Sequence, residues 1–108
     1  MALVPEEWHS YAQASYCSYL LKNYDDANVY IDRALLLESE DQYVYWLKGI
    51  VLDKLGQWPE AALNINRAYQ MGGPLGAFES RIIEKGREFN ASNSLAQSWK
   101  KVKNRFDR

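Results

Sequence analysis

Apolar residues recur along this chain at the three- and four-residue spacing of an α-helix, in segments separated by short polar turns. The clearest example is the stretch 55–68. Gly56 can take the left-handed conformation that ends a helix, and Pro59 suits the first turn of the next helix. One face of that next helix then carries apolar residues at i, i+4 and i+7, namely Ala61, Ile65 and Ala68. The stretch therefore predicts a helix end, a tight turn and a second helix.

A second copy of this pattern appears when the chain is shifted against itself by 34 positions. The class of residue is kept at each matched position, from the aromatic residues of the first helix to the small residues of the second. The matched pairs are Tyr11 with Tyr45, Ser15 with Gly49, Leu21 with Leu55, Tyr24 with Trp58, Asp26 with Glu60, Ala27 with Ala61, Ile31 with Ile65, and Ala34 with Ala68. The match predicts two tandem helical hairpins. The small residues Gly49, Ala61 and Ala68 indicate that helix backbones pack closely there.

Turn and capping residues place the helix ends. Pro5 begins the first helix, Asn23 caps the second, and either Ser39 or Asp41 caps the third. The fourth helix stops at the breaker segment 72–74, which reads Gly-Gly-Pro. The predicted helices run from about 5 to 21, 23 to 37, 39 or 41 to 55, and 58 to 71.

Beyond Pro74 the 34-residue period continues while the residue types change. We predict a fifth helix from about 75 to 89, a loop at 90–93, and a sixth helix that opens with a capping box of Ser94 and Gln97. Large apolar residues then follow the small-residue face of the fourth helix by 34 positions: Leu95, Trp99, Val102 and Phe106. A helix with nothing stacked behind it needs no small residues, so this unit is interpreted as a closing hairpin. The alternative is that the stripe docks a partner.

The same C-terminal segment is also basic. The basic residues Lys100, Lys101, Lys103 and Arg105 lie mostly on the opposite face of the helix from Trp99 and Phe106. Trp99, Phe106, Lys100 and Lys103 form a secondary docking candidate for RNA or an acidic membrane surface. The alternative interpretation is a solvated cap helix whose apolar face seals the stack.

In these positions the chain resembles the tetratricopeptide repeat (TPR) family, which is built from 34-residue helix-turn-helix units. The matching residues of the second copy are Tyr45, Gly49, Leu52, Trp58, Ala61, Ile65 and Ala68, and those of the first are Tyr11, Ser15, Tyr24, Ala27, Ile31 and Ala34. Ala14 and Lys48 depart from the Leu that is usual in the family, and Ser39 and Gly73 replace its terminal Pro. The resemblance covers about two thirds of the chain.

The resemblance implies an all-α fold, a right-handed superhelical stack of three helical hairpins in one domain spanning 1–108. The first repeat covers about 8–41 and the second about 42–75. A degenerate closing hairpin covers about 76–107.

The resemblance also implies a concave groove lined by the first helix of each repeat. The positions that face it are His9, Ala12, Tyr16, Tyr19, Tyr43, Trp46, Ile50, Asp53 and Lys54. Tyr and Trp combine a large contact area with a polar group, as recognition surfaces require. We interpret these positions as a groove for an apolar or aromatic peptide or a partner helix. The alternative is that the aromatic residues pack on one another as core.

Some TPR modules hold the C-terminal carboxylate of heat-shock chaperones with a clamp of Lys, Asn and Arg. The corresponding positions here are Ala12, Tyr16, Leu47, Ala77 and Arg81. Only Arg81 has a suitable side chain, so the sequence excludes this clamp.

Composition narrows the remaining classes of function. The chain has 13 basic and 14 acidic residues and a net charge of −1, which gives no general attraction to nucleic acid or anionic membranes. The one cysteine, Cys17, excludes a disulfide framework and a multi-cysteine metal site. The first residues lack the pattern of a signal peptide, and no apolar run approaches the roughly 18 residues of a membrane span. We expect a cytoplasmic protein.

No catalytic motif stands out in the sequence. His9 is the one histidine, and no base or metal partner is evident for it. The chain has no phosphate-binding loop, zinc motif or nucleophile elbow. We therefore expect no enzyme activity, no metal and no cofactor.

The predicted function is to bind another protein, through a peptide or a helix, as an adaptor, assembly factor or chaperone, with no small-molecule substrate. One alternative is a small TPR-type chaperone of a secretion-system subunit. An alternative of another class is an RNA-binding helical repeat, although the basic groove that such proteins use is not seen. Assembly into an oligomer stays open.

Overall fold

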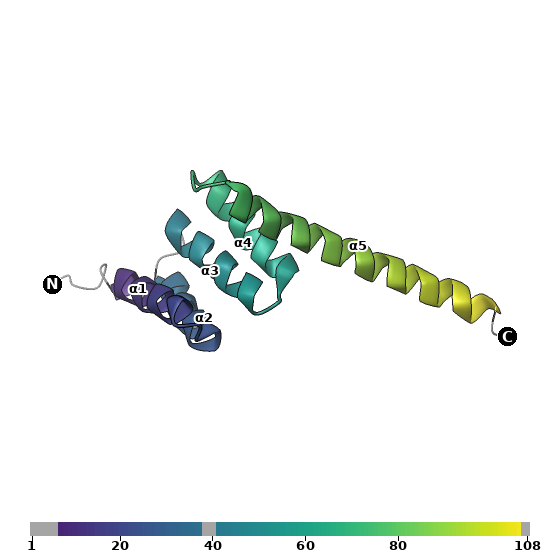
Figure 1. Ribbon diagram of the computed structural model, residues 1–108, viewed down its shortest axis with the longest axis horizontal. Coiled ribbons are helices and arrows are strands. Elements are labelled where there is room, and N and C mark those ends of the chain that lie inside the picture. The colour runs from purple at the N-terminus through teal and green to yellow at the C-terminus, as the bar shows by residue number, and fades with distance from the viewer. Residues whose placement is uncertain (1–6, 38–40, 107–108) are drawn as a thin grey trace.

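The chain is all-helical over the part that its structure describes (Figure 1). The computed structural model describes residues 7–37 and 41–106, and the side chains within them as far as Ala91. These residues form five α-helices and no strand. The helices are α1 (Glu7–Leu20), α2 (Tyr24–Leu37), α3 (Gln42–Lys54), α4 (Trp58–Gln70) and α5 (Ala77–Phe106). The expected all-α class is thus confirmed.

The first four helices form the two predicted hairpins. Helix α1 packs on α2 and α3 packs on α4, while α2 and α3 join the two hairpins side by side. Helix α5 packs on α4. The core lies between these helices and consists of aliphatic and small residues: Ala12, Ala27, Ile31, Ala34, Val44, Leu47, Ile50, Val51, Leu52, Ala61, Ile65 and Ile82.

Both hairpins turn in the same way, 34 residues apart. Gly56 has a φ of 77°, and Lys22, its counterpart in the first hairpin, has a φ of 66°. The amide of Asn23 donates to the carbonyl of Ser18 at 2.8 Å, and that of Gln57 donates to Leu52 at 3.0 Å. These six-residue bonds are Schellman motifs, which close a helix through one left-handed residue. The turn predicted at Gly56 is confirmed, and Lys22 adopts the same conformation without being a glycine.

The interiors of the hairpins also repeat. Ser15 lies in the core and its Oγ donates to the Ala27 carbonyl at 2.7 Å. At the matching place, a Cβ on Gly49 would lie 3.2 Å from the Ala61 carbonyl oxygen and 2.6 Å from Ile65 side-chain atoms. Helices this close leave no room for a larger residue at Gly49. The prediction of close packing at Gly49, Ala61 and Ala68 is confirmed, since all three are buried.

A cation–π pair repeats with the same period. The guanidinium of Arg33 lies 5.9 Å from the Tyr11 ring centroid, and that of Arg67 lies 4.9 Å from the Tyr45 centroid. The two arginines are separated by 34 residues, and so are the two tyrosines. Each pair joins the first helix of a hairpin to the second, so the repetition extends from single residues to contacts.

Helix α3 begins at one of the two predicted N-cap residues, Asp41. The Asp41 carboxylate accepts from the amides of Tyr43 at 2.8 Å and Val44 at 3.3 Å. These bonds satisfy amides that a helix N-terminus otherwise leaves without a partner. Asp41 is therefore the N-cap, while the other predicted cap, Ser39, lies outside the described residues.

The predicted closing hairpin is wrong. The loop expected at 90–93 does not form, and α5 runs as one helix of 30 residues from Ala77 to Phe106. The segment 90–93 contains Asn, Ala and Ser but neither Gly nor Pro, and each of these residues costs a helix well under 1 kcal/mol relative to Ala. Continuing the helix keeps its backbone hydrogen bonds, so polar residues alone do not end it. Figure 1 shows α5 extending well beyond the body formed by α1–α4.

Gly86 sets how closely α5 approaches α4. A Cβ at this position would lie 2.6 Å from the Ala62 Cβ and 2.7 Å from the Trp58 carbonyl oxygen. Since both neighbours belong to α4, only glycine permits this crossing. Among the helices described, none combines the length and apolar character that crossing a bilayer requires.

Candidate functional site

Four partly exposed aromatic residues lie on α1 and α3, and we call them the aromatic face: Tyr16, Tyr19, Tyr43 and Trp46. Tyr16 and Tyr19 stack with ring centroids 6.3 Å apart and planes 10° apart, and Tyr43 and Trp46 stack at 6.1 Å and 24°. Each pair is three residues apart on one helix, so its members lie one turn apart on the same side. Stacking of this kind favours the observed orientation of the rings in the absence of a partner.

The two pairs adjoin because α1 packs against α3. Burial raises the pKa of the Tyr43 phenol, and the nearby phenol of Tyr16, the Cys17 thiol and the Asp41 carboxylate raise it further. Burial also raises the pKa of Tyr19, with additional contributions from Tyr24, Asp53 and Tyr16. Both hydroxyls are therefore neutral at physiological pH and can donate or accept a hydrogen bond.

The structure removes two residues from the predicted groove. Ala12 and Ile50 are in the core, with exposed fractions of 0% and 1%. Side chains buried to this degree cannot contact a bound molecule. The resemblance to TPR modules assigned both residues to the groove, but the packing of the helices covers them.

The polar members of the predicted groove divide between surface and interior. His9 and Lys54 are exposed, with His9 beside Trp8 at a ring distance of 5.3 Å. The Asp53 side chain is only 8% exposed, and its Oδ1 lies 3.5 Å from Lys85 Nζ on α5. Asp53 is thus committed to a contact between helices, whereas His9 and Lys54 are available at the surface.

Glu79 holds Trp46 of the aromatic face in place, and it was not among the residues predicted for the site. Its Oε2 accepts from the Trp46 indole Nε1 at 2.9 Å, and its Oε1 accepts from the Gly76 amide at 2.9 Å. Burial alone would raise the pKa of Glu79, which is 7% exposed, but hydrogen bonds from Trp46 and from the backbone amides of Glu79 and Gly76 lower it below its ordinary value. The charged carboxylate joins α3 to the start of α5. No sequence motif signals a pairing of residues 33 positions apart.

A hollow of about 270 Å³ lies at the edge of the aromatic face. Gln42, Tyr43, Trp46 and Pro74 line it. Since the Trp46 indole N–H is bonded to Glu79, the ring offers only its apolar surface here. The hollow therefore suits one apolar side chain.

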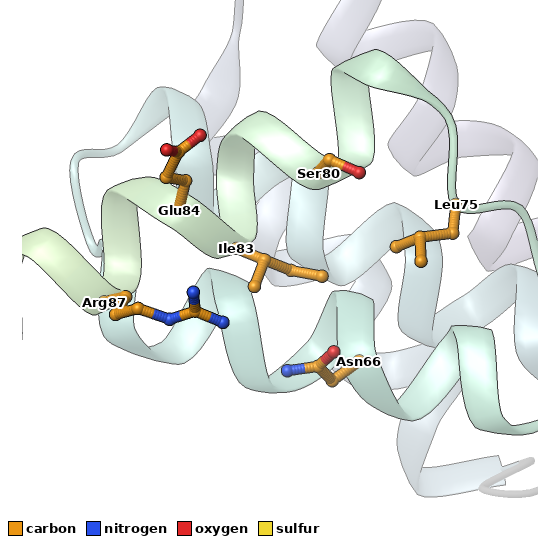
Figure 2. Close-up of a pocket in the computed structure, with 6 residues that line it drawn as sticks. All are labelled: Asn66, Leu75, Ser80, Ile83, Glu84 and Arg87. Carbon is orange, nitrogen blue, oxygen red and sulfur yellow. The ribbon is translucent and has the colours of Figure 1, made fainter.

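A second hollowed surface runs along the seam between α4 and α5, and we call it the α4–α5 groove. One hollow of about 330 Å³ is lined by Asn66, Leu75, Ser80, Ile83, Glu84 and Arg87. Figure 2 shows Asn66, Leu75 and Ile83 together at the seam, with Glu84 directed away from it. A neighbouring hollow of about 310 Å³ shares Asn66, Ile83 and Arg87 and extends to Leu63 and Asn90. This groove was not predicted from the sequence, because a sixth helix was expected to lie here.

The predicted secondary docking candidate remains a prediction. Trp99, Lys100, Lys103 and Phe106 belong to the helical backbone of α5, but their side chains lie outside the described part of the structure. The described residues contain no group of three or more His, Cys, Asp or Glu side chains placed to hold a metal ion.

Comparison with known proteins adds no family to this description. No protein-family model, curated protein or solved structure matches the chain. The aromatic face and the α4–α5 groove are therefore the two observations from which a function can be argued.

Proposed function

We propose that this chain is a non-catalytic module that binds an apolar or aromatic segment of another protein on its aromatic face. The observation that carries the proposal is the set of four stacked, partly exposed rings of Tyr16, Tyr19, Tyr43 and Trp46 on α1 and α3. Tyr and Trp are the residues that most often dominate binding energy at protein interfaces. Tyr16 is 37% exposed, so a large part of its ring is available for contact.

Pre-organisation supports this proposal. The rings are held by stacking, and Trp46 is held in addition by Glu79. A surface whose side chains are already ordered loses little conformational entropy when a partner binds. Most of the buried area then contributes to affinity.

The chemistry of the face specifies the kind of segment. The hollow beside Trp46 and Pro74 accepts an apolar side chain such as Leu or Phe. The neutral hydroxyls of Tyr19 and Tyr43 offer hydrogen bonds to the backbone carbonyls of the bound segment. An extended or helical segment with apolar residues at regular spacing meets both conditions.

The 34-residue repetition favours the same class of function. Paired turns, paired Tyr–Arg contacts and paired close approaches support the resemblance to TPR modules, and right-handed superhelical stacking belongs to this proposal. Proteins of that family bind other proteins. A role as adaptor, assembly factor or chaperone follows from the resemblance.

The test is a selection of displayed peptides against the immobilised full chain, followed by affinity measurement with variants. The variant Tyr16→Ala/Trp46→Ala removes one ring from each stacked pair. A matched control is Tyr30→Ala/Tyr69→Ala, which removes two exposed tyrosines from α2 and α4. Losing two interface rings costs at least 2 kcal/mol when they are hot spots, which weakens binding roughly 30-fold or more.

The expected result is a set of apolar or aromatic peptides that bind the wild type and the control equally and the double variant at least 30-fold more weakly. Far-ultraviolet circular dichroism checks that the double variant keeps its helicity. Peptides whose affinity is unchanged in the double variant would exclude the aromatic face. Salt-dependent binding of RNA oligonucleotides in place of peptides would favour the other class of function.

A further inference from the structure

The α4–α5 groove has exposed apolar residues along its seam and polar residues beside them, and none of the described helices covers it. Leu63 on α4 is 69% exposed, and Leu75 beside the start of α5 is 41% exposed. Ile83 is half-buried and lines both hollows. In the preceding hairpin, the matching residue is Gly49, which α4 covers completely. The corresponding face of α5 is therefore open.

The two hairpins define the register that a covering helix would follow. Ser15 faces Ala27 in the first hairpin, and Gly49 faces Ala61 in the second. Adding 34 places residue 95 opposite Ile83. The residues at this and the following matched positions are the large apolar stripe Leu95, Trp99, Val102 and Phe106. The register thus assigns this chain's own C-terminal segment to the groove.

The C-terminal segment cannot cover the α4–α5 groove of its own chain while α5 is straight. The two hairpins reverse direction at Lys22 and Gly56, both with positive φ, and the next position in the series is Asn90. Asn90 lies inside the continuous helix. The stripe at residues 95–106 is consequently carried away from the groove of its own chain, in a molecule 69 Å long and 25 Å wide (Figure 1).

We propose that two copies of the chain exchange these segments, so that residues 94–106 of each α5 lie antiparallel in the α4–α5 groove of the other copy. The contact is isologous, because each copy supplies one groove and one helix. It places Leu95 and Trp99 of one copy against Ile83 of the other. A short helix end is marginally stable alone in water, and burial of its apolar stripe stabilises it.

The size of the residues favours exchange over the tight hairpins seen earlier in the chain. Ser15 and Gly49 allow Ala27 and Ala61 to come close, whereas Ile83 and Leu95 are both large. The hollows of about 330 and 310 Å³ provide room for large side chains that the first two hairpins lack. The groove and the stripe are therefore complementary in size.

The first measurement is the solution mass of the full chain by light scattering after size exclusion. The expected mass is twice the 12.5 kDa of one chain. Trp99→Ala/Phe106→Ala should give a monomer, and the control Gln97→Ala/Asn104→Ala, on the opposite face by helical spacing, should remain dimeric. A wild type that is monomeric at every accessible concentration would overturn the proposal.

Cross-linking separates exchange from a hairpin within one chain, independently of how the double variant folds. With Cys17→Ser as background, chains carrying Ile83→Cys are mixed with tagged chains carrying Leu95→Cys and oxidised gently. Exchange predicts a disulfide-linked heterodimer, detected by the mass difference of the tag. A single chain carrying both substitutions that closes quantitatively into a cross-linked monomer would contradict it, as would the absence of heterodimer in the mixture.

Discussion

Replacing Glu79 tests how the aromatic face is positioned. Glu79→Ala removes the acceptor of two hydrogen bonds, from the Trp46 indole and the Gly76 amide, both at 2.9 Å. Hydrogen bonds to a charged group contribute about 1.5–3 kcal/mol each. Both donors are partly exposed and regain some water, so we expect a total loss of about 2–3 kcal/mol in the free energy of unfolding. Glu79→Gln keeps one acceptor oxygen and the size of the side chain, and should lose about half as much.

The sign of the pH dependence follows from the lowered pKa of Glu79. A carboxyl whose pKa is lower in the folded state stabilises the fold fully above its ordinary value of 4.5 and loses this contribution as the pH falls through the folded-state pKa. The difference between wild type and Glu79→Gln should therefore be largest at neutral pH and shrink in acid.

Urea unfolding followed by circular dichroism, at neutral and at acid pH, measures both effects. Glu88→Gln is a matched control, because Glu88 is exposed on the same helix and should change stability by less than about 0.5 kcal/mol. A Glu79→Ala variant as stable as this control would refute the predicted role of Glu79. A loss of stability in Glu79→Gln that is equal at both pH values would refute the predicted pH dependence.

Two further substitutions, measured by thermal unfolding, test the turn at Lys22 and the packing of α5 on α4. Lys22→Gly relieves a left-handed residue with φ of 66°, a conformation that costs about 1–2 kcal/mol, against the roughly 0.5–1 kcal/mol by which glycine favours the unfolded chain. We expect a gain of about 0.5–1 kcal/mol that Lys22→Ala does not reproduce, and equal effects of the two would show that charge rather than backbone is responsible. Gly86→Ala brings a Cβ within 2.7 Å of the Trp58 carbonyl oxygen, and the overpacking cost of about 1–3 kcal/mol exceeds the roughly 1 kcal/mol gained in helix propensity. A higher melting temperature for Gly86→Ala would show that α5 shifts freely on α4.

The hairpins were predictable because local and long-range signals coincide there. Gly56 and Pro59 mark a turn by backbone chemistry alone, and the period of 34 identifies which residues face each other. Capping preferences narrowed the start of α3 to Ser39 or Asp41, and the structure identifies Asp41 as the cap. Two independent kinds of evidence thus agree on the first four helices.

The course of α5 was not predictable from the same signals. The repeat period demanded a turn near Asn90, but helix propensity allows residues 90–93 to stay helical, and the period alone does not decide between them. Neither the period nor propensity states which neighbour will bury the apolar stripe. The loop was wrong because the sequence was interpreted as a chain that closes on itself.

The site was predictable in its aromatic residues and not in its supports. Tyr16, Tyr19, Tyr43 and Trp46 follow from helical spacing on the first helix of each repeat. Ala12 and Ile50 were placed on the wrong side of the boundary between groove and core, because both are apolar and lie one helical turn from an aromatic residue. Glu79 acts across 33 positions, and only three-dimensional contact identifies its role.

The central proposal, that a partner segment binds the aromatic face, is tested most directly by the indole N–H resonances of the full chain labelled with nitrogen-15. Trp46 lies on the aromatic face, while Trp58 packs against Phe89 at the interface of α4 and α5, with ring centroids 6.2 Å apart. Titration with a selected peptide should move the Trp46 resonance to saturation and leave that of Trp58 in place. Movement of the Trp58 resonance with Trp46 unchanged would contradict the proposal and place binding at the α4–α5 groove.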